Sequence, residues 1–161
     1  MRTREFIRAT NDADQILAVF RVYKPPVPIA VIKKIFKQCT IDKRDFHEDA
    51  YGFSFPDEEK ALWRVLINSK YSFQIQRFTA FHELFHMLQN KPGYCRTTSA
   101  GDLEERLANH FAESMLMPAK WIKKYWRRFH NIYALAIIFD VTPEMVESRL
   151  KALNLWYLQV A

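Results

Sequence analysis

The sequence predicts an α+β fold that is mostly helical and has a small central β-sheet. Three observations predict it. Apolar residues recur with helical spacing near the N-terminus, short aromatic and aliphatic runs typical of strands occupy residues 40–68, and helical spacing returns from residue 73 onward. Hydrophobic residues make up 49% of the 161 residues, enough for a sizeable core. Because no linker-like segment interrupts the chain, we expect one domain over residues 1–161.

The first half of the chain is predicted to hold two helices followed by strands. Helical spacing of apolar residues predicts a helix over residues 12–24, which the Pro25-Pro26-Val27-Pro28 segment ends. Pro28 suits the first turn of a second helix over about residues 28–38. Residues 40–68 predict two or three short strands, with Gly52 and Pro56-Asp57 as turn signals.

The second half of the chain is predicted to be helical. Lys91-Pro92-Gly93 ends the first of its helices, and a polar loop over residues 96–101 follows. Asp102 with Glu105 resembles a capping box at the start of the next helix. Thr142 and Pro143 suit the start of the last helix. We expect helices over residues 73–90, 102–117, 119–129, 131–139 and 143–153.

Composition narrows the classes of function. The formal net charge of +6 favours acidic partners, among them nucleic acid and acidic protein surfaces. Only three glycines occur, and their spacing excludes glycine-rich phosphate loops. Cys39 and Cys95 form no CxxC pair, and the charged N-terminus is unlike a signal peptide. The longest apolar run, residues 132–139, is too short to span a membrane, so we expect a cytoplasmic protein with no membrane contact.

The clearest chemical signal is the HExxH sequence formed by His82, Glu83 and His86. Two histidines four residues apart lie on one face of a helix, so both imidazoles can reach one Zn²⁺ ion. Glu83 projects beside them, where it can take a proton from water activated by the metal. The motif therefore predicts a metal centre with His82 and His86 as ligands and Glu83 as the general base.

A catalytic zinc site requires a third protein ligand, and the helix predicted over residues 102–117 offers four candidates. These are Glu104, Glu105, His110 and Glu113. Spacing favours Glu105, because Ala108 and Ala112 share its face and would let the two helices approach closely. Glu113 stays open as the alternative. Imidazole and carboxylate ligands also accept Mn²⁺ or Fe²⁺.

Two segments resemble the ImmA/IrrE metallopeptidase family. Residues 77–86 read RFTAFHELFH and residues 105–118 read ERLANHFAESMLMP, against the family patterns RFTxxHELGH and ExxANxFAxxLLMP. Ile67-Asn68 and the segment 139–153, FDVTPEMVESRLKAL, extend the likeness over roughly residues 25–155. Phe85 departs from the usual glycine and could narrow the substrate cleft. Met115 departs from the frequent leucine.

The resemblance implies a gluzincin-like metallopeptidase domain of the short, ImmA-like form, without an additional C-terminal sensor domain. It implies Zn²⁺ bound by His82, His86 and Glu105, with Glu83 as the base. It also implies a substrate, a helix-turn-helix repressor whose cleavage relieves repression of a mobile element, prophage or stress regulon. Tyr94 and His110 are candidates for oxyanion stabilisation, and Thr79 and Asn109 for orienting the ligands.

A second class of function is a DNA-binding or repressor-binding regulatory module that acts without proteolysis. Residues 131–155 resemble a helix-turn-helix pair. The segment 120–130 just before them is basic and carries interleaved aromatic residues, a composition that suits weak contact with nucleic acid. An amphipathic helix with a solvated basic face explains the same segment.

Overall fold

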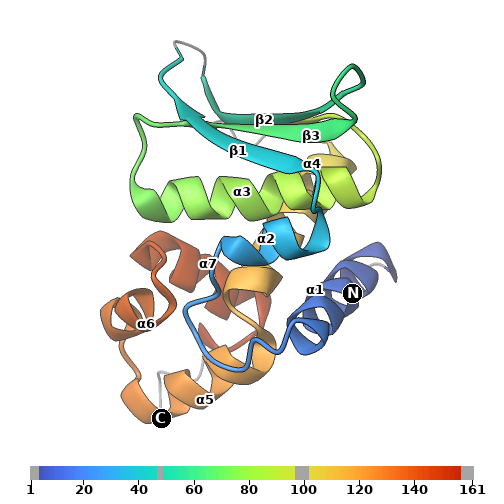
Figure 1. Ribbon diagram of the computed structural model, residues 1–161. Coiled ribbons are helices and arrows are strands. Elements are labelled where there is room, and N and C mark those ends of the chain that lie inside the picture. Colours follow the sequence, from blue (N-terminus) through green and yellow to red (C-terminus); the bar gives the residue numbers. More distant parts are fainter. Residues whose placement is uncertain (1–3, 47–48, 97–101, 157–161) are drawn as a thin grey trace.

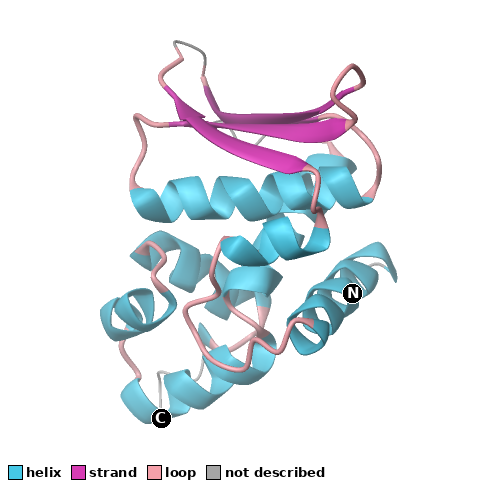
Figure 2. Ribbon diagram, in the orientation of Figure 1, coloured by secondary structure: helices cyan, strands magenta, loops and turns pink. Residues whose placement is uncertain are grey.

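The computed structural model describes residues 4–46, 49–96 and 102–156. Its strands gather at one end of the molecule and most of its helices at the other, with helix α3 lying across one face of the sheet between them (Figures 1 and 2). The predicted α+β class is confirmed. The elements are α1 (Arg4–Val19), α2 (Ala30–Ile35), β1 (Cys39–Arg44), β2 (Ala50–Asp57), β3 (Leu62–Asn68), α3 (Phe73–Leu88), β4 (Gly93–Arg96), α4 (Leu103–Leu116), α5 (Ala119–Phe129), α6 (Ile132–Phe139) and α7 (Pro143–Ala152).

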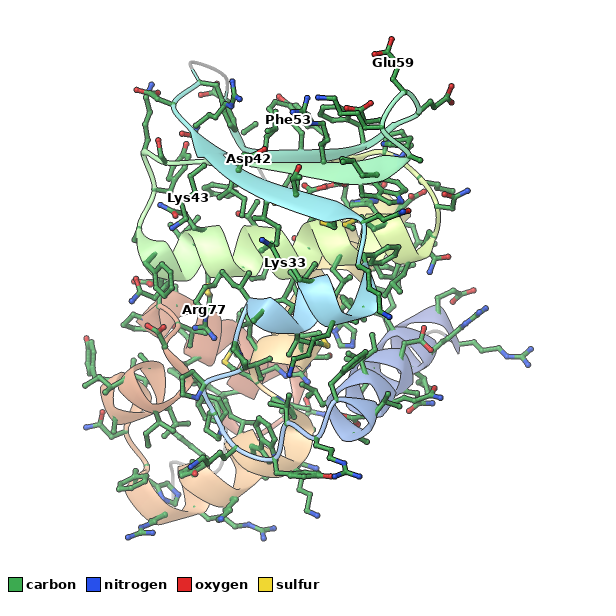
Figure 3. All side chains as sticks on the ribbon, viewed as in Figure 1. Lys33, Asp42, Lys43, Phe53, Glu59 and Arg77 are labelled. Carbon is green, nitrogen blue, oxygen red and sulfur yellow. The ribbon has the colours of Figure 1, made fainter. Side chains whose placement is uncertain are left out.

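The four strands form one mixed sheet in the order β1-β3-β2-β4. Strand β1 pairs in parallel with β3, whereas β2 pairs antiparallel with both β3 and β4. One sheet face packs on α3 through buried residues such as Gly52, Ser54 and Val65. The opposite face carries Phe53, which points away from α3 in Figure 3. Strand β4 is an edge strand that runs directly beside the end of α3.

The structure differs in detail from the sequence predictions for the first half of the chain. Helix α1 begins at Arg4 and ends at Val19, so the prediction of residues 12–24 is wrong at both ends. Its buried residues are Ala9, Ala13 and Leu17, which are spaced four residues apart on one face of the helix. Two of the three are alanines, which a search for large apolar side chains does not count, so the first half of the helix was missed. Gly52 is not a turn but lies inside β2, whereas Pro56-Asp57 ends that strand as a turn signal should, and the Asp57 carboxylate accepts a hydrogen bond from the Lys60 amide in the turn that follows. A Cβ atom at Gly52 would lie 2.5 Å from Thr79 Cγ2, so this glycine permits the sheet to approach α3.

The helices predicted from residue 73 onward are confirmed, with bounds close to those expected. Ser72 caps α3 by accepting a hydrogen bond from the Ile75 amide, and Asp102 caps α4 by accepting one from the Glu105 amide. Strand β4 was not predicted, because the sequence signal there is a Lys-Pro-Gly turn. Most of the predicted polar loop, residues 97–101, lies outside the described residues.

Arg77 joins α3 to two distant segments. Its buried guanidinium donates hydrogen bonds to the backbone carbonyls of Val27, Phe139 and Asp140 and lies 3.2 Å from the Asp140 carboxylate. Asp140 ends α6 in the left-handed conformation, with φ of 52°, and begins the turn into α7. In Figure 3, Arg77 points from α3 toward these C-terminal helices. The α6–α7 pair is thereby fixed to the helix that carries the HExxH sequence.

Candidate metal centre

Helix α3 places the two histidines of the HExxH sequence side by side. His82 and His86 are one turn apart and buried, and their Nε2 atoms lie 3.2 Å from each other. Nearly every residue of α3 from Gln76 to Met87 is buried, because the helix lies between the sheet and the other helices. The imidazoles are therefore held in a fixed orientation and face one common point.

Helix α4 brings Glu105 to the same point. One carboxylate oxygen lies 3.3 Å from Nε2 of His82 and the other lies 3.2 Å from Nε2 of His86. Zinc bonds of about 2.0–2.1 Å with tetrahedral angles place neighbouring ligand atoms roughly 3.3 Å apart. The separations within this group fit that geometry. Two neutral imidazole nitrogens and one carboxylate oxygen also fit the chemistry of a divalent metal.

The charges in this group are complementary. Partial burial opposes ionisation of Glu105, but the hydrogen bonds and charges of His82 and His86 outweigh it and lower the pKa of Glu105 to about 2. Burial acts against protonation of His86, but the neighbouring carboxylates outweigh it and raise the pKa of His86. The anionic carboxylate of Glu105 thus favours a positive charge at the common point, which a divalent metal ion would supply.

Glu83 occupies the side of α3 that faces the sheet. Its carboxylate accepts a hydrogen bond of 2.5 Å from the Ser54 hydroxyl on β2 and one of 3.1 Å from the Cys95 amide on β4. The residue is completely buried. Burial raises the pKa of Glu83, although His82, His86 and the hydrogen bond from Ser54 act in the opposite direction. A raised pKa makes Glu83 a stronger base than an ordinary carboxylate, which suits a group that accepts and returns a proton.

Two further predicted residues lie at the edge of this group. Asn109 Oδ1 is 2.8 Å from Nδ1 of His82, so it is placed to orient that ring as expected. Thr79 instead donates to the Ile75 carbonyl within α3. Glu104 lies 3.5 Å from Nδ1 of His86, on the side of the ring away from Glu105.

The other candidates lie elsewhere. The Glu113 carboxylate accepts a hydrogen bond of 2.8 Å from Ser148 on α7. His110 faces α1, where its Nε2 lies 2.8 Å from the Thr10 hydroxyl. Tyr94 packs against Phe53 on the sheet face opposite α3, with ring centroids 4.7 Å apart and the ring planes tilted by 55°. The suggestions of His110 and Glu113 as ligands, and of His110 and Tyr94 as oxyanion donors, therefore do not agree with the structure.

Several residues of this centre were missed from the sequence. Ser54, Gly93 and Cys95 all contact Glu83, or lie close to it, from strands β2 and β4. The Cys95 thiol belongs to a group with His82 and Glu83 whose possible ligand atoms lie within 4.8 Å of one another. Gly93 offered one signal, since it is one of only three glycines in the chain.

Phe85 packs toward α4, where its ring centroid is 5.6 Å from that of Phe111.

The model of the IrrE N-terminal-like domain family, Peptidase_M78, matches residues 28–151, which include the whole candidate centre. The chain belongs to this family. The resemblance to ImmA/IrrE proteins in the sequence is thereby confirmed. Membership of the IrrE N-terminal-like family supports a metallopeptidase type of domain and implies a divalent metal, a requirement that the donor set of His82, His86 and Glu105 fits.

A solved structure shares the fold of this IrrE N-terminal-like chain. A Mycobacterium tuberculosis transcriptional regulator matches with a TM-score of 0.61 and 15% sequence identity, over 89% of this chain and 46% of that chain. The chain thus spans less than half the length of that regulator. A search of the curated proteins gives no match. Among the described residues, no helix has the length and apolar character needed to cross a membrane.

Proposed function

We propose that this protein is a zinc-dependent endopeptidase that cleaves a helix-turn-helix repressor and so relieves repression of a mobile element, prophage or stress regulon. His82, His86 and Glu105 are the proposed metal ligands and Glu83 is the proposed general base. The observation that carries the proposal is the spacing of 3.2–3.3 Å among Nε2 of His82, Nε2 of His86 and the Glu105 carboxylate, beside a buried Glu83. The same ligands suit Mn²⁺ and Fe²⁺.

A divalent metal held by these ligands supplies a Lewis acid that lowers the pKa of water and polarises a carbonyl group. Glu83 takes the proton from the attacking water and later gives it to the leaving amine. Its two carboxylate oxygens are held by the Ser54 hydroxyl and the Cys95 amide, so the base is fixed before substrate binds. Asn109 holds the His82 ring, which keeps Nε2 of His82 directed at the common point.

The repressor substrate is proposed from the family resemblance and the regulatory role it supports. The test is co-incubation of the protein with a candidate helix-turn-helix repressor, followed by mass spectrometry of the fragments. Wild type is expected to give one dominant cut. Glu83→Gln is expected to keep its zinc but lose about 10²–10⁴-fold in rate, since it removes only the base.

The metal content is measured on the same samples. Wild type is expected to carry one zinc per chain and His86→Ala almost none, because two remaining ligands do not hold the ion. Equal zinc in wild type and His86→Ala would show that the ion lies elsewhere and would contradict the ligand assignment.

The second candidate function is regulation by binding alone. It is supported by α5, whose basic residues are all exposed and which lies beside the α6–α7 pair. These residues are Lys120, Lys123, Lys124, Arg127 and Arg128. Base reading by α7 has less support, because the helix presents an exposed Glu144 while its Arg149 is buried against the Met117 carbonyl. If Glu83→Gln relieves repression as well as wild type and no fragment forms, the protein acts by binding.

A further inference from the structure

The two candidate histidine ligands differ in what their second ring nitrogen contacts. Nδ1 of His82 lies 2.8 Å from Asn109 Oδ1, a good hydrogen-bond distance. Nδ1 of His86 is buried and has no hydrogen-bond partner within the described residues. The charged group near it is Glu104, whose Oε1 atom lies 3.5 Å away. One ring is thus already anchored, and the other faces a carboxylate just beyond hydrogen-bond distance.

The proton on His86 must be on Nδ1 if Nε2 is to bind a metal. Nε2 of His86 faces Nε2 of His82 and the Glu105 carboxylate, both 3.2 Å away, so this nitrogen must present its lone pair to the common point. The Nδ1–H group then needs an acceptor, because metal-binding histidines almost always donate this proton to a carboxylate, carbonyl or water. Glu104 is the acceptor that α4 supplies.

Glu104 is itself held in place from its other side. Its Oε2 atom accepts a hydrogen bond of 2.8 Å from Lys91 Nζ. The Lys91 backbone amide also donates to the His86 carbonyl, at 3.0 Å, where α3 ends. Lys91 therefore fixes the Glu104 carboxylate relative to the turn of α3 that carries His86. The two adjacent acids of α4 therefore contact different nitrogens: Glu105 faces Nε2 of both histidines, and Glu104 faces Nδ1 of His86.

We infer that Glu104 is a positioning residue, which accepts the Nδ1 proton of His86 in the metal-loaded protein and is held in place by Lys91. This inference rests on the proposed metal centre. Glu104 does not bind the ion. It fixes the His86 ring and increases the electron density on Nε2, which strengthens metal binding.

The experiment measures zinc affinity of the full chain by competition with a chromophoric chelator. Glu104→Ala is expected to weaken zinc binding about 10–100-fold. Glu104→Gln is expected to lie between that variant and wild type, because its amide oxygen still accepts the proton without the negative charge. Lys91→Met is expected to cause a smaller loss than Glu104→Ala. The matched control is Glu113→Ala, which removes an acid from the same helix away from the centre and should leave zinc affinity unchanged.

Two further readouts separate positioning from general support of the fold. The unfolding midpoint of the metal-free protein should be nearly the same in wild type and Glu104→Ala, whose side chain is 35% exposed. In zinc-loaded protein, the NMR signal of the His86 Nδ1 proton should shift upfield or vanish in Glu104→Ala. Equal zinc affinity in Glu104→Ala and wild type would overturn the role of Glu104 alone. Absence of zinc binding in wild type would overturn the metal centre and this role with it.

Discussion

Gly93 lies directly against the carboxylate of Glu83. A Cβ atom at residue 93 would overlap Glu83 Oε2, and it would also lie 2.6 Å from the Ser54 hydroxyl and 2.7 Å from a ring carbon of His86. Strand β4 can therefore run beside α3 only because residue 93 has no side chain. This close approach brings the Cys95 amide to within 3.1 Å of Glu83.

Gly93→Ala is expected to disturb both stability and turnover. The new methyl group overpacks a filled region, which lowers the free energy of unfolding by about 1–3 kcal/mol. It also displaces the Glu83 carboxylate, so peptide cleavage should fall. Chemical denaturation and fragment analysis measure the two effects. Tyr94→Phe is the control, because its ring stays on the opposite sheet face beside Phe53. Unchanged stability and cleavage in Gly93→Ala would show that β4 does not approach α3 this closely.

Ser54→Ala is expected to change the pH dependence of cleavage. The hydrogen bond from Ser54 lowers the pKa of Glu83 against the larger effect of burial, so its loss raises that pKa further. A base with a higher pKa stays protonated to higher pH, and the acid limb of the pH–rate profile therefore moves upward in pH. Zinc content should stay at one per chain. An acid limb at the same or lower pH would contradict the role of Ser54.

The sequence could predict α3, α4 and the residues they contribute because those signals are local. His82, Glu83 and His86 belong to one helical turn, and Glu105 follows from the spacing of small residues on one helix. The fold class follows in the same way from periodicity in segments of 8 to 16 residues.

The contacts of Glu83 could not be predicted, because they depend on pairing between distant strands. Ser54 reaches Glu83 only because β2 packs against α3, and Cys95 reaches it only because β4 pairs with β2. Strand β4 has only four residues and begins at the glycine of the Pro92-Gly93 pair, so it forms because its partner strand β2 pairs with it. The position of His110 could not be predicted either, since it required knowing that α1 packs on α4.

Arg77→Met is expected to destabilise the fold strongly. The substitution removes the donor for three backbone carbonyls and leaves Asp140 without its nearest cation. Breaking a buried pair costs about 3–5 kcal/mol, and the low end applies because Asp140 is 32% exposed. Arg127→Met, on the exposed face of α5, should cost about 0.5 kcal/mol or less. Urea unfolding of both variants gives the comparison. Equal losses would mean that Arg77 does not anchor the α6–α7 turn.

Glu105→Gln and Glu113→Gln separate the two acids that the sequence left open as third ligand. Glu105 lies 3.2–3.3 Å from both imidazoles, whereas Glu113 accepts a hydrogen bond from Ser148 on α7. Each substitution removes one negative charge from α4 and keeps the side-chain volume, so general electrostatic effects are matched. Glu105→Gln replaces an anionic ligand by a neutral amide. It should weaken zinc binding by about 100-fold or more, since losing a residue that only hydrogen-bonds to a ligand already has an effect of that size.

Zinc competition by titration with a chelator measures both variants, and thermal unfolding of the metal-free proteins supplies the structural control. Because its carboxylate contacts α7 and not the imidazoles, Glu113→Gln should match wild type in zinc affinity while losing a little stability. Glu105→Gln should lose zinc affinity and should also lower the stability of the metal-free protein, because His82 and His86 lower the pKa of Glu105 and its charge therefore stabilises the fold at neutral pH. If Glu113→Gln loses zinc and Glu105→Gln keeps it, Glu105 is not the third ligand and the centre must be assigned again.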